Sequence, residues 1–271
     1  MSRDRVRQIT VIVATLAQIF LNSFTQASRN TADIADSFPN FFVPAGITFA
    51  VWGPLFLGTI VYAVYQALPA QTTRPIHRRV GWWAASAVAM NGLWPLAYGN
   101  AGLYNTPDFQ PALILVSLGI IVWGLISLGV VFVTLRRMEL STTDEWLVRV
   151  PWYGLFAWIT VATIANATVA LIGLGWETTD NGAFWSALII AVATVITSGV
   201  ILYSRGGVGT GAYVAVIVWA LIGIFMGNND QSTLVGAVSL IAAAVVVLVA
   251  LYRFINRNGE PESSRPAMTT A

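Results

Sequence analysis

Eight long apolar stretches constrain the fold of this chain more than any other feature of its sequence. They cover residues 9–25, 45–68, 80–100, 111–135, 147–175, 183–203, 211–227 and 234–252. About 20 apolar residues in a helix are enough to cross the hydrocarbon core of a bilayer. Lipid offers no partners to backbone groups, and the stretches lack the alternation of barrel strands, so each is expected to be a helix. The sequence therefore predicts an all-α, polytopic membrane helix bundle with about eight transmembrane helices.

The composition agrees with a membrane protein and excludes several kinds of chemistry. Hydrophobic residues make up 56% of the 271 residues and charged residues 10%, whereas roughly a quarter of the residues are charged in a soluble domain. All 14 basic residues are arginines and there is no cysteine, so lysine Schiff bases, disulfides and thiol chemistry are excluded. A net charge of +2 with dispersed arginines does not indicate nucleic-acid binding.

The arginines predict the orientation in the membrane. Every arginine except Arg29 lies beside span ends that face one side, and basic residues near span ends stay in the cytoplasm. Both termini are therefore expected in the cytoplasm, and the membrane is expected to be the cell (inner) membrane of a bacterium or archaeon. One alternative stays open, because residues 1–27 also fit a cleaved secretory signal, which would leave seven spans.

Ionisable side chains are missing from the middle of every predicted span. Such side chains mark ion pathways and reactive sites in membranes, so we expect no catalytic residue, no metal site and no cofactor, and no enzymatic activity. The only histidine, His77, lies in the basic stretch RPIHRR and is expected to be a solvated surface residue. Gly223 and Gly227 form a G-x-x-x-G pair in the seventh span, which we expect to serve close packing within the chain.

The spans are rich in tryptophan, with 11 in the chain. Six lie near predicted span ends, where interfacial belts collect such rings: Trp82, Trp83, Trp146, Trp152, Trp176 and Trp185. The deeper ones are Trp52, Trp94, Trp123, Trp158 and Trp219, and two asparagines, Asn91 and Asn166, also lie well inside spans. A buried indole or amide needs hydrogen-bond partners. Two interpretations remain open at this point, a pocket toward the outer side lined by aromatic rings and amides, or helix packing sealed by aromatic contacts.

Four motifs give these residues a family context. The stretch PAGITFAVWGPLF contains Pro44, Trp52 and Leu55, and NGLWPLAYG contains Asn91 and Trp94. A central tryptophan, Trp123, follows in the fourth span. The fifth span carries WITVATIAN, with Trp158, Ala162, Thr163 and Asn166. In order and spacing the motifs resemble those of the TspO/MBR family, the tryptophan-rich sensory and translocator proteins that are also called peripheral benzodiazepine receptors.

The resemblance implies a domain organisation and a function. Residues 1–175 would form the TspO-like five-helix bundle, residues 176–255 an additional three-helix membrane segment, and residues 256–271 a disordered cytoplasmic tail. The implied function is a membrane receptor or sensor that binds a flat, largely apolar ligand, such as a porphyrin or sterol, in a cavity of the bundle. Residues 26–44 would form a lid over it, with Arg29 as a partner for porphyrin propionates. The residues expected to line or shape the cavity are Pro44, Phe49, Trp52, Asn91, Trp94, Trp123, Trp158 and Asn166.

Two other functions stay open beside this one. The first is a membrane carrier for a small uncharged or lipophilic solute, and the second is an intramembrane enzyme that acts on a lipid or isoprenoid. The expected partners are a hydrophobic small molecule and the lipid bilayer, with homodimer formation left open and no nucleic acid.

Overall fold

The computed structural model describes residues 2–28, 31–176 and 181–256, and within these ranges the regular structure is entirely helical. The eight long helices are α1 (Arg3–Ser28), α3 (Trp52–Ala67), α4 (Pro75–Tyr98), α5 (Pro111–Arg136), α7 (Val150–Gly173), α8 (Gly182–Tyr203), α9 (Val208–Asn228) and α10 (Thr233–Ile255). The shorter elements are α2 (Thr31–Asp36), α6 (Thr142–Asp144), the 3-10 helices η1 (Gly46–Val51) and η2 (Pro69–Gln71), and a π-helical turn, η3 (Glu145–Arg149). The prediction of an all-helical bundle is confirmed.

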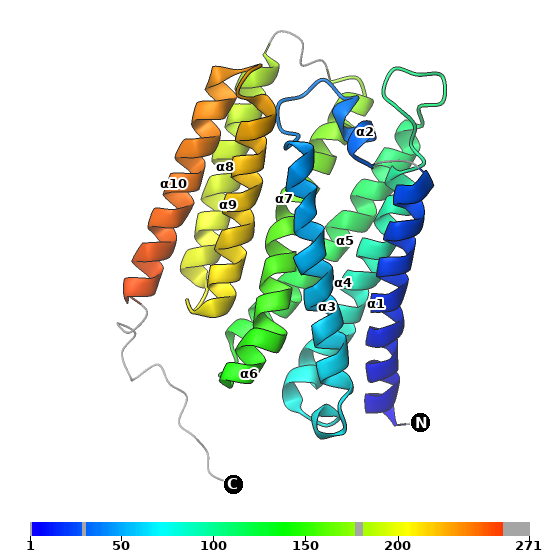
Figure 1. The fold of residues 1–271 in the computed structure, drawn as a ribbon, viewed down its shortest axis with the longest axis vertical. Helices are drawn as coiled ribbons and strands as arrows, with labels where there is room; N and C mark the ends of the chain where they lie inside the picture. Colours follow the sequence, from blue (N-terminus) through cyan, green and yellow to red (C-terminus); the bar gives the residue numbers. More distant parts are fainter. Residues whose placement is uncertain (1, 29–30, 177–180, 257–271) are drawn as a thin grey trace.

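The long helices run side by side in alternating directions (Figure 1). Consequently α1 begins and α10 ends at the same end of the bundle, the lower end in Figure 1. Among the described residues, seven helical segments are long and apolar enough to cross a membrane. The remaining predicted span is the third in the chain, residues 80–100, and corresponds to α4. This helix is long enough, but its mean hydropathy is lower, because it carries three tryptophans, Asn91 and Pro95.

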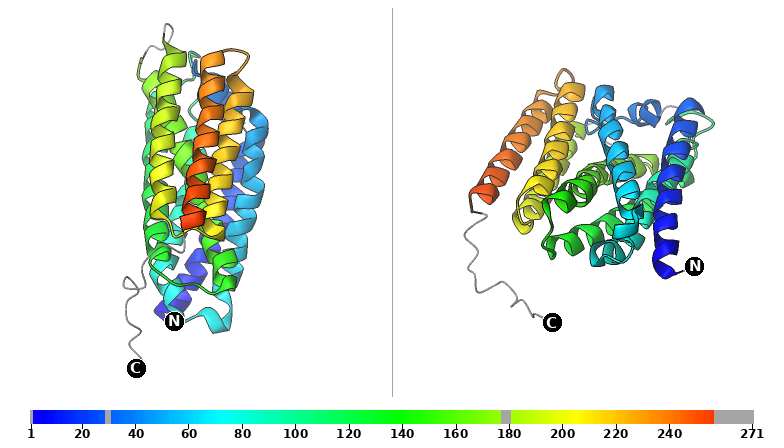
Figure 2. Two further views of the ribbon diagram at one scale, coloured as in Figure 1. Left: turned by 90° about the vertical axis from the view of Figure 1, so that its left-hand side faces the viewer. Right: turned by 60° about the horizontal axis from the view of Figure 1, so that its bottom comes forward.

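The bundle has two parts, and the largest contact between them is that of α7 with α9. In the first, α4 lies between α1 and α5, α5 packs on α7, and α3 packs on α1 and α7. In the second, α8, α9 and α10 gather on one side of the molecule, and α9 makes the contact with α7 (Figure 2). In the apolar part of α7, 67% of the residues are buried, compared with 28–44% in the other six segments. The fifth span is therefore the central helix of the bundle.

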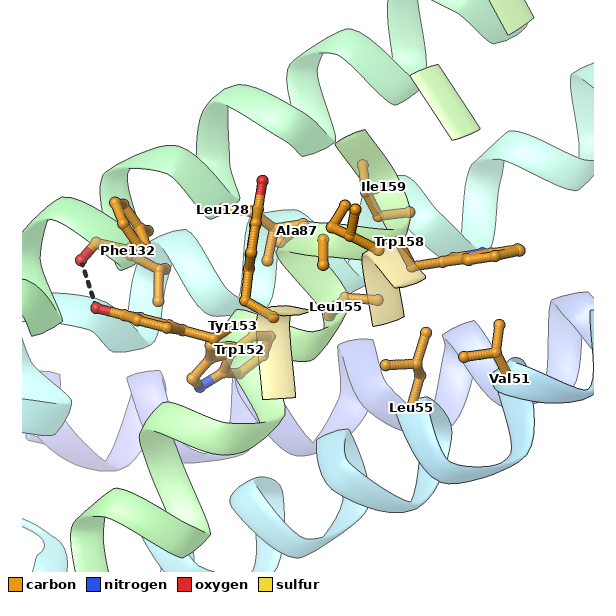
Figure 3. Close-up of a cluster of buried hydrophobic side chains, with 14 of the residues drawn as sticks. Val51, Leu55, Ala87, Leu128, Phe132, Trp152, Tyr153, Leu155, Trp158 and Ile159 are labelled. Carbon is orange, nitrogen blue, oxygen red and sulfur yellow. Dashed lines mark hydrogen bonds between the residues drawn. The ribbon is translucent and has the colours of Figure 1, made fainter. Parts of the chain in front are cut away.

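Large side chains of α7 fill the core of the first part. Trp152, Tyr153 and Leu155 pack among residues of η1, α3, α4 and α5 (Figure 3). The prediction that Trp152 belongs to an interfacial belt is wrong, because its side chain is 1% exposed and its ring meets that of Tyr62 edge to face at 4.8 Å. The physical reason is that α7 is packed on several sides, so Trp152 meets α3 and does not face outward.

Candidate functional site

A cavity lies near the end of the bundle opposite to the start of α1, beneath residues 31–49. From here on we call these residues the lid; they overlap the predicted lid, residues 26–44, and extend it to Phe49. The lid consists of α2, the connection to η1, and most of η1 (Figure 1). The cavity has a volume of about 70 Å³, and α4, α7 and the lid contribute its walls. Its lining residues are Thr31, Ala35, Val43, Pro44, Phe49, Trp94, Tyr98, Trp158, Val161, Ala162, Ala165, Asn166 and Val169. Arg29, the expected partner of propionates, lies outside the described residues.

Five of the eight residues singled out from the sequence meet at this cavity: Pro44, Phe49, Trp94, Trp158 and Asn166. Their rings are arranged in two groups. Trp94 and Tyr98, one turn apart on α4, stack at 4.6 Å between ring centroids. Phe49 of η1 meets Trp158 of α7 edge to face at 6.0 Å. Both arrangements are favourable for aromatic pairs, so the cavity has rigid aromatic walls.

Asn166 supplies the polar centre of the wall. Its Oδ1 accepts a hydrogen bond from Nε1 of Trp94 at 2.8 Å and a second from Oγ of Ser117 on α5 at 3.1 Å. An indole N–H only donates, so the amide must turn its oxygen toward Trp94 and its NH2 group away. Ser117 was not expected from the sequence, because a serine in an apolar helix gives no signal of the face on which it lies.

Two buried donors at the cavity remain without a partner among the described residues. They are Nδ2 of Asn166 and Nε1 of Trp158, and each side chain is 3% exposed. A buried donor that lacks a partner costs about 1–3 kcal/mol, and native proteins usually satisfy such groups. Both side chains line the same cavity, so the two unpaired donors belong to residues of its wall.

The other three residues lie away from the cavity wall. Trp52 does not line the cavity, but its ring packs edge to face against the ring of Trp158, with 5.8 Å between the centroids. Trp52 therefore supports a residue of the wall. Asn91 is buried where α4 faces α1, and its backbone oxygen accepts a hydrogen bond from Asn22. Trp123 lies on the outer surface of α5, 47% exposed, and donates to Oγ of Ser86. The structure therefore does not bring Asn91 and Trp123 together with the cavity residues.

A second, more polar cavity lies on the other side of the lid. It has a volume of about 620 Å³ and shares Val43 and Pro44 with the first cavity. Asp36 and Asn40 of the lid, together with Asn228 of α9, contribute polar groups to its walls. Partial burial, with the neighbouring Asp33, raises the pKa of Asp36. We call this space the vestibule. The two residues that it shares with the first cavity, Val43 and Pro44, both belong to the lid.

The opposite end of the bundle carries a buried polar network. Asp144 accepts hydrogen bonds from Arg74, Tyr65 and Ser141, and its ion pair with Arg74 measures 2.6 Å. His77 lies beside it in the first turn of α4, before residue 80 where the predicted span begins. The prediction of a solvated His77 is wrong, because the side chain is 0% exposed and lies against the rings of Tyr62 and Tyr65. Within the described ranges, no three potential metal ligands are grouped.

Comparison with known proteins adds one finding to this geometry. A family model described as TSPO-like protein matches residues 6–252. The match begins in α1 and ends in α10, so it includes the three C-terminal helices as well as the first five spans, four of which carry the sequence motifs. No curated protein and no solved structure gives a match.

Proposed function

The chain belongs to the TSPO-like family and is a polytopic membrane protein, and from this premise we propose that it is a receptor or sensor for a flat, largely apolar ligand. The ligand occupies the cavity beneath the lid, and no chemical step on it is required. Porphyrins and sterols are the ligand classes that the resemblance of the motifs implies. We further propose that the cavity opens toward the outer side of a bacterial or archaeal inner membrane, with both termini in the cytoplasm, because the arginines gather at the other end.

The observation that carries this proposal is the pairing of aromatic walls with two buried donors. Phe49, Trp94, Tyr98 and Trp158 offer ring faces and edges against which a flat molecule buries apolar area. Nδ2 of Asn166 and Nε1 of Trp158 are donors in an apolar setting. They favour a ligand that presents oxygen or ring nitrogen acceptors over a plain hydrocarbon, since leaving a buried donor unpaired costs free energy.

The size of the cavity adds a requirement. Its volume of about 70 Å³ is small compared with typical ligand pockets, which hold roughly 300–1,000 Å³. A porphyrin or sterol therefore needs the cavity to widen on binding and the lid to open for its passage. The vestibule, at about 620 Å³, provides space on the outer side of Val43 and Pro44 for such a movement.

Tryptophan fluorescence tests the proposal directly. Titration of the purified protein with protoporphyrin IX is expected to give saturable quenching from Trp94 and Trp158, and a sterol that occupies the same cavity should compete with the porphyrin and reverse the quenching. Asn166→Ala should weaken the binding. Trp123→Phe is the matched control, because Trp123 lies on the outer surface of α5, and it should leave the affinity unchanged. Absence of saturable quenching with porphyrins, sterols and carotenoids alike would reject the receptor function.

A flux measurement separates the receptor from the alternative carrier. The protein is reconstituted in proteoliposomes, and release of a ligand that quenches its fluorescence is followed across the bilayer. A receptor binds the ligand without accelerating its transfer. Catalysed transfer that Trp158→Phe reduces would favour the carrier instead.

A further inference from the structure

The segment Val43 to Phe49 in the lid has two different sides. On one side, Val43, Pro44 and Phe49 line the ligand cavity. On the other side, the segment lies against α9, a helix that contributes nothing to the cavity wall among the described residues. α9 can therefore influence ligand binding only through its neighbours at the cavity, which are this segment and α7.

Three hydrogen bonds join α9 to the backbone of the segment. Asn228 donates from Nδ2 to the carbonyl oxygen of Val43 at 2.9 Å. The N–H of Ala45 donates to the carbonyl oxygen of Gly223 at 2.9 Å. Nε1 of Trp219 donates to the carbonyl oxygen of Thr48 at 2.8 Å. These bonds fix the start, the middle and the end of the segment, across about 180 positions of sequence separation.

The glycine pair of α9 explains how the segment comes so close. A Cβ atom on Gly223 would lie 2.1 Å from Oγ1 of Thr48, and one on Gly227 would lie 2.8 Å from the backbone nitrogen of Ala45. Trp219, Gly223 and Gly227 follow one another at intervals of four, so they share one face of the helix. The expected close packing by this G-x-x-x-G pair is therefore present, and the neighbour that it admits is the lid.

We propose that α9 is a latch for the lid, and that the three C-terminal helices control how fast ligand enters and leaves the cavity. The proposal rests on the receptor function above, in that the exchanging ligand is the one bound beneath the lid. α9 is itself held by α7, α8 and α10, so the latch is part of a rigid unit. Opening requires the segment to break its bonds to α9.

The latch predicts a kinetic signature that differs from that of the cavity wall. α9 touches the lid in the closed protein with or without ligand, so weakening the latch destabilises both closed states alike. Entry and exit then accelerate by the same factor, and Kd stays nearly constant. Changes at Asn166 or Trp158, in contrast, alter contacts to the ligand and change Kd.

Thiol labelling tests the latch without any ligand. The chain has no cysteine, so Ala162→Cys places a single thiol on the cavity wall. Its reaction with a charged methanethiosulfonate reagent reports opening of the lid. Trp219→Phe, which removes the hydrogen bond to Thr48, should accelerate labelling about two- to tenfold, as expected for one hydrogen bond. Asn228→Ala, made separately, should act in the same direction.

Trp123→Phe is the matched control for Trp219→Phe. Trp123 is also partly exposed on a helix surface and makes a single Nε1 hydrogen bond, but to Ser86 and not to the lid. It should leave the labelling rate unchanged. Equal rates in the parent Ala162→Cys protein, the Trp219→Phe variant and the Asn228→Ala variant would overturn the latch.

A second readout separates the latch from the receptor function. Stopped-flow exchange of protoporphyrin IX should show both rate constants raised in Trp219→Phe at nearly unchanged Kd. If no porphyrin or sterol binds, the receptor proposal fails while the labelling rates still decide whether α9 holds the lid. If binding occurs and Trp219→Phe changes neither rate constant, the receptor proposal stands and the latch is rejected.

Discussion

The indole Nε1 of Trp94 donates a 2.8 Å hydrogen bond to Oδ1 of Asn166, and this bond joins α4 to α7 at the wall of the cavity. The two residues are 72 positions apart in the chain. The bond fixes the plane of the Trp94 ring and also turns the free NH2 group of Asn166 away from Trp94. A bond between two helices thereby determines which group of Asn166 stays unpaired beside the cavity.

The coupling between these residues is measurable as a double-mutant cycle. Asn166→Ala should lower the free energy of unfolding by about 1–3 kcal/mol, because it leaves Nε1 of Trp94 unpaired in a partly buried position. Trp94→Phe should cost less when Asn166 is already alanine, with a coupling of about 1 kcal/mol. Denaturant titration in detergent micelles provides the four values. Strict additivity of the two substitutions would show that the bond contributes nothing to the fold.

Trp158→Phe should separate ligand affinity from stability. Nε1 of Trp158 has no partner within the described chain, so its removal loses no hydrogen bond in the free protein and removes a buried donor. A ligand acceptor would lose its bond, which should weaken binding about two- to tenfold. Quenching titrations of the wild type and the variant give the two Kd values.

Trp152→Phe is the control for this prediction. Nε1 of Trp152 is likewise buried and unpaired in the part of the chain that the structure describes, on the same helix, but the side chain does not line the cavity. Its substitution should leave Kd unchanged. An equal loss of affinity in both variants would mean that Trp158 acts through packing and not through its N–H group.

Gly92→Ala should force α1 and α4 apart. A Cβ atom at residue 92 would lie 2.8 Å from Cα of Gln18, and backbone cannot rotate away as a side chain can. Overpacking of this kind typically costs about 1–3 kcal/mol. Gly119→Ala on α5 is the comparison, because its Cβ would meet nothing within 4 Å in the described structure, and helix propensity then favours alanine by up to about 1 kcal/mol. In thermal unfolding in detergent, Gly92→Ala should have a lower melting temperature than the wild type and Gly119→Ala a higher one.

Acid should destabilise the protein through His77. Burial, with the positive charges of Arg7 and Arg74, lowers the pKa of His77 from 6.5 to about 4, against a smaller opposing effect of Asp144. The unfolded chain therefore binds more protons than the folded one between these values. The contribution of His77 to stability is complete above about pH 6.5 and is lost as the pH falls toward about 4.

Melting temperatures measured in detergent at about pH 7 and at about pH 5 test this prediction. The wild type should lose more stability on acidification than His77→Asn, whose amide does not titrate. Asp36 acts in the opposite sense, since a carboxyl with a raised pKa favours the folded state at low pH. Identical pH dependence in wild type and variant would show that His77 has an ordinary pKa.

The motif positions alone selected five of the cavity residues but also three that do not line the cavity. Trp94 and Trp123 are both central tryptophans in apolar spans, yet one lines the cavity and the other lies on the outer surface of α5. A helix that is apolar all round carries no amphipathic signal for the face that turns inward. Its rotation about its own axis is set by the helices that pack on it, and the sequence does not contain that information locally.

The sequence by itself determined what depends on short-range properties. The length and hydropathy of the stretches specify the helices, because a backbone in lipid must satisfy its own hydrogen bonds. The motif order specifies the family. Tertiary structure alone decided the contacts between distant segments, such as Trp219 with Thr48 and Asn166 with Trp94. It also decided that His77 is buried, because rings from α3 cover a residue that follows a basic loop in the sequence. Such contacts depend on how the helices rotate and approach one another, which is fixed only when the whole bundle packs.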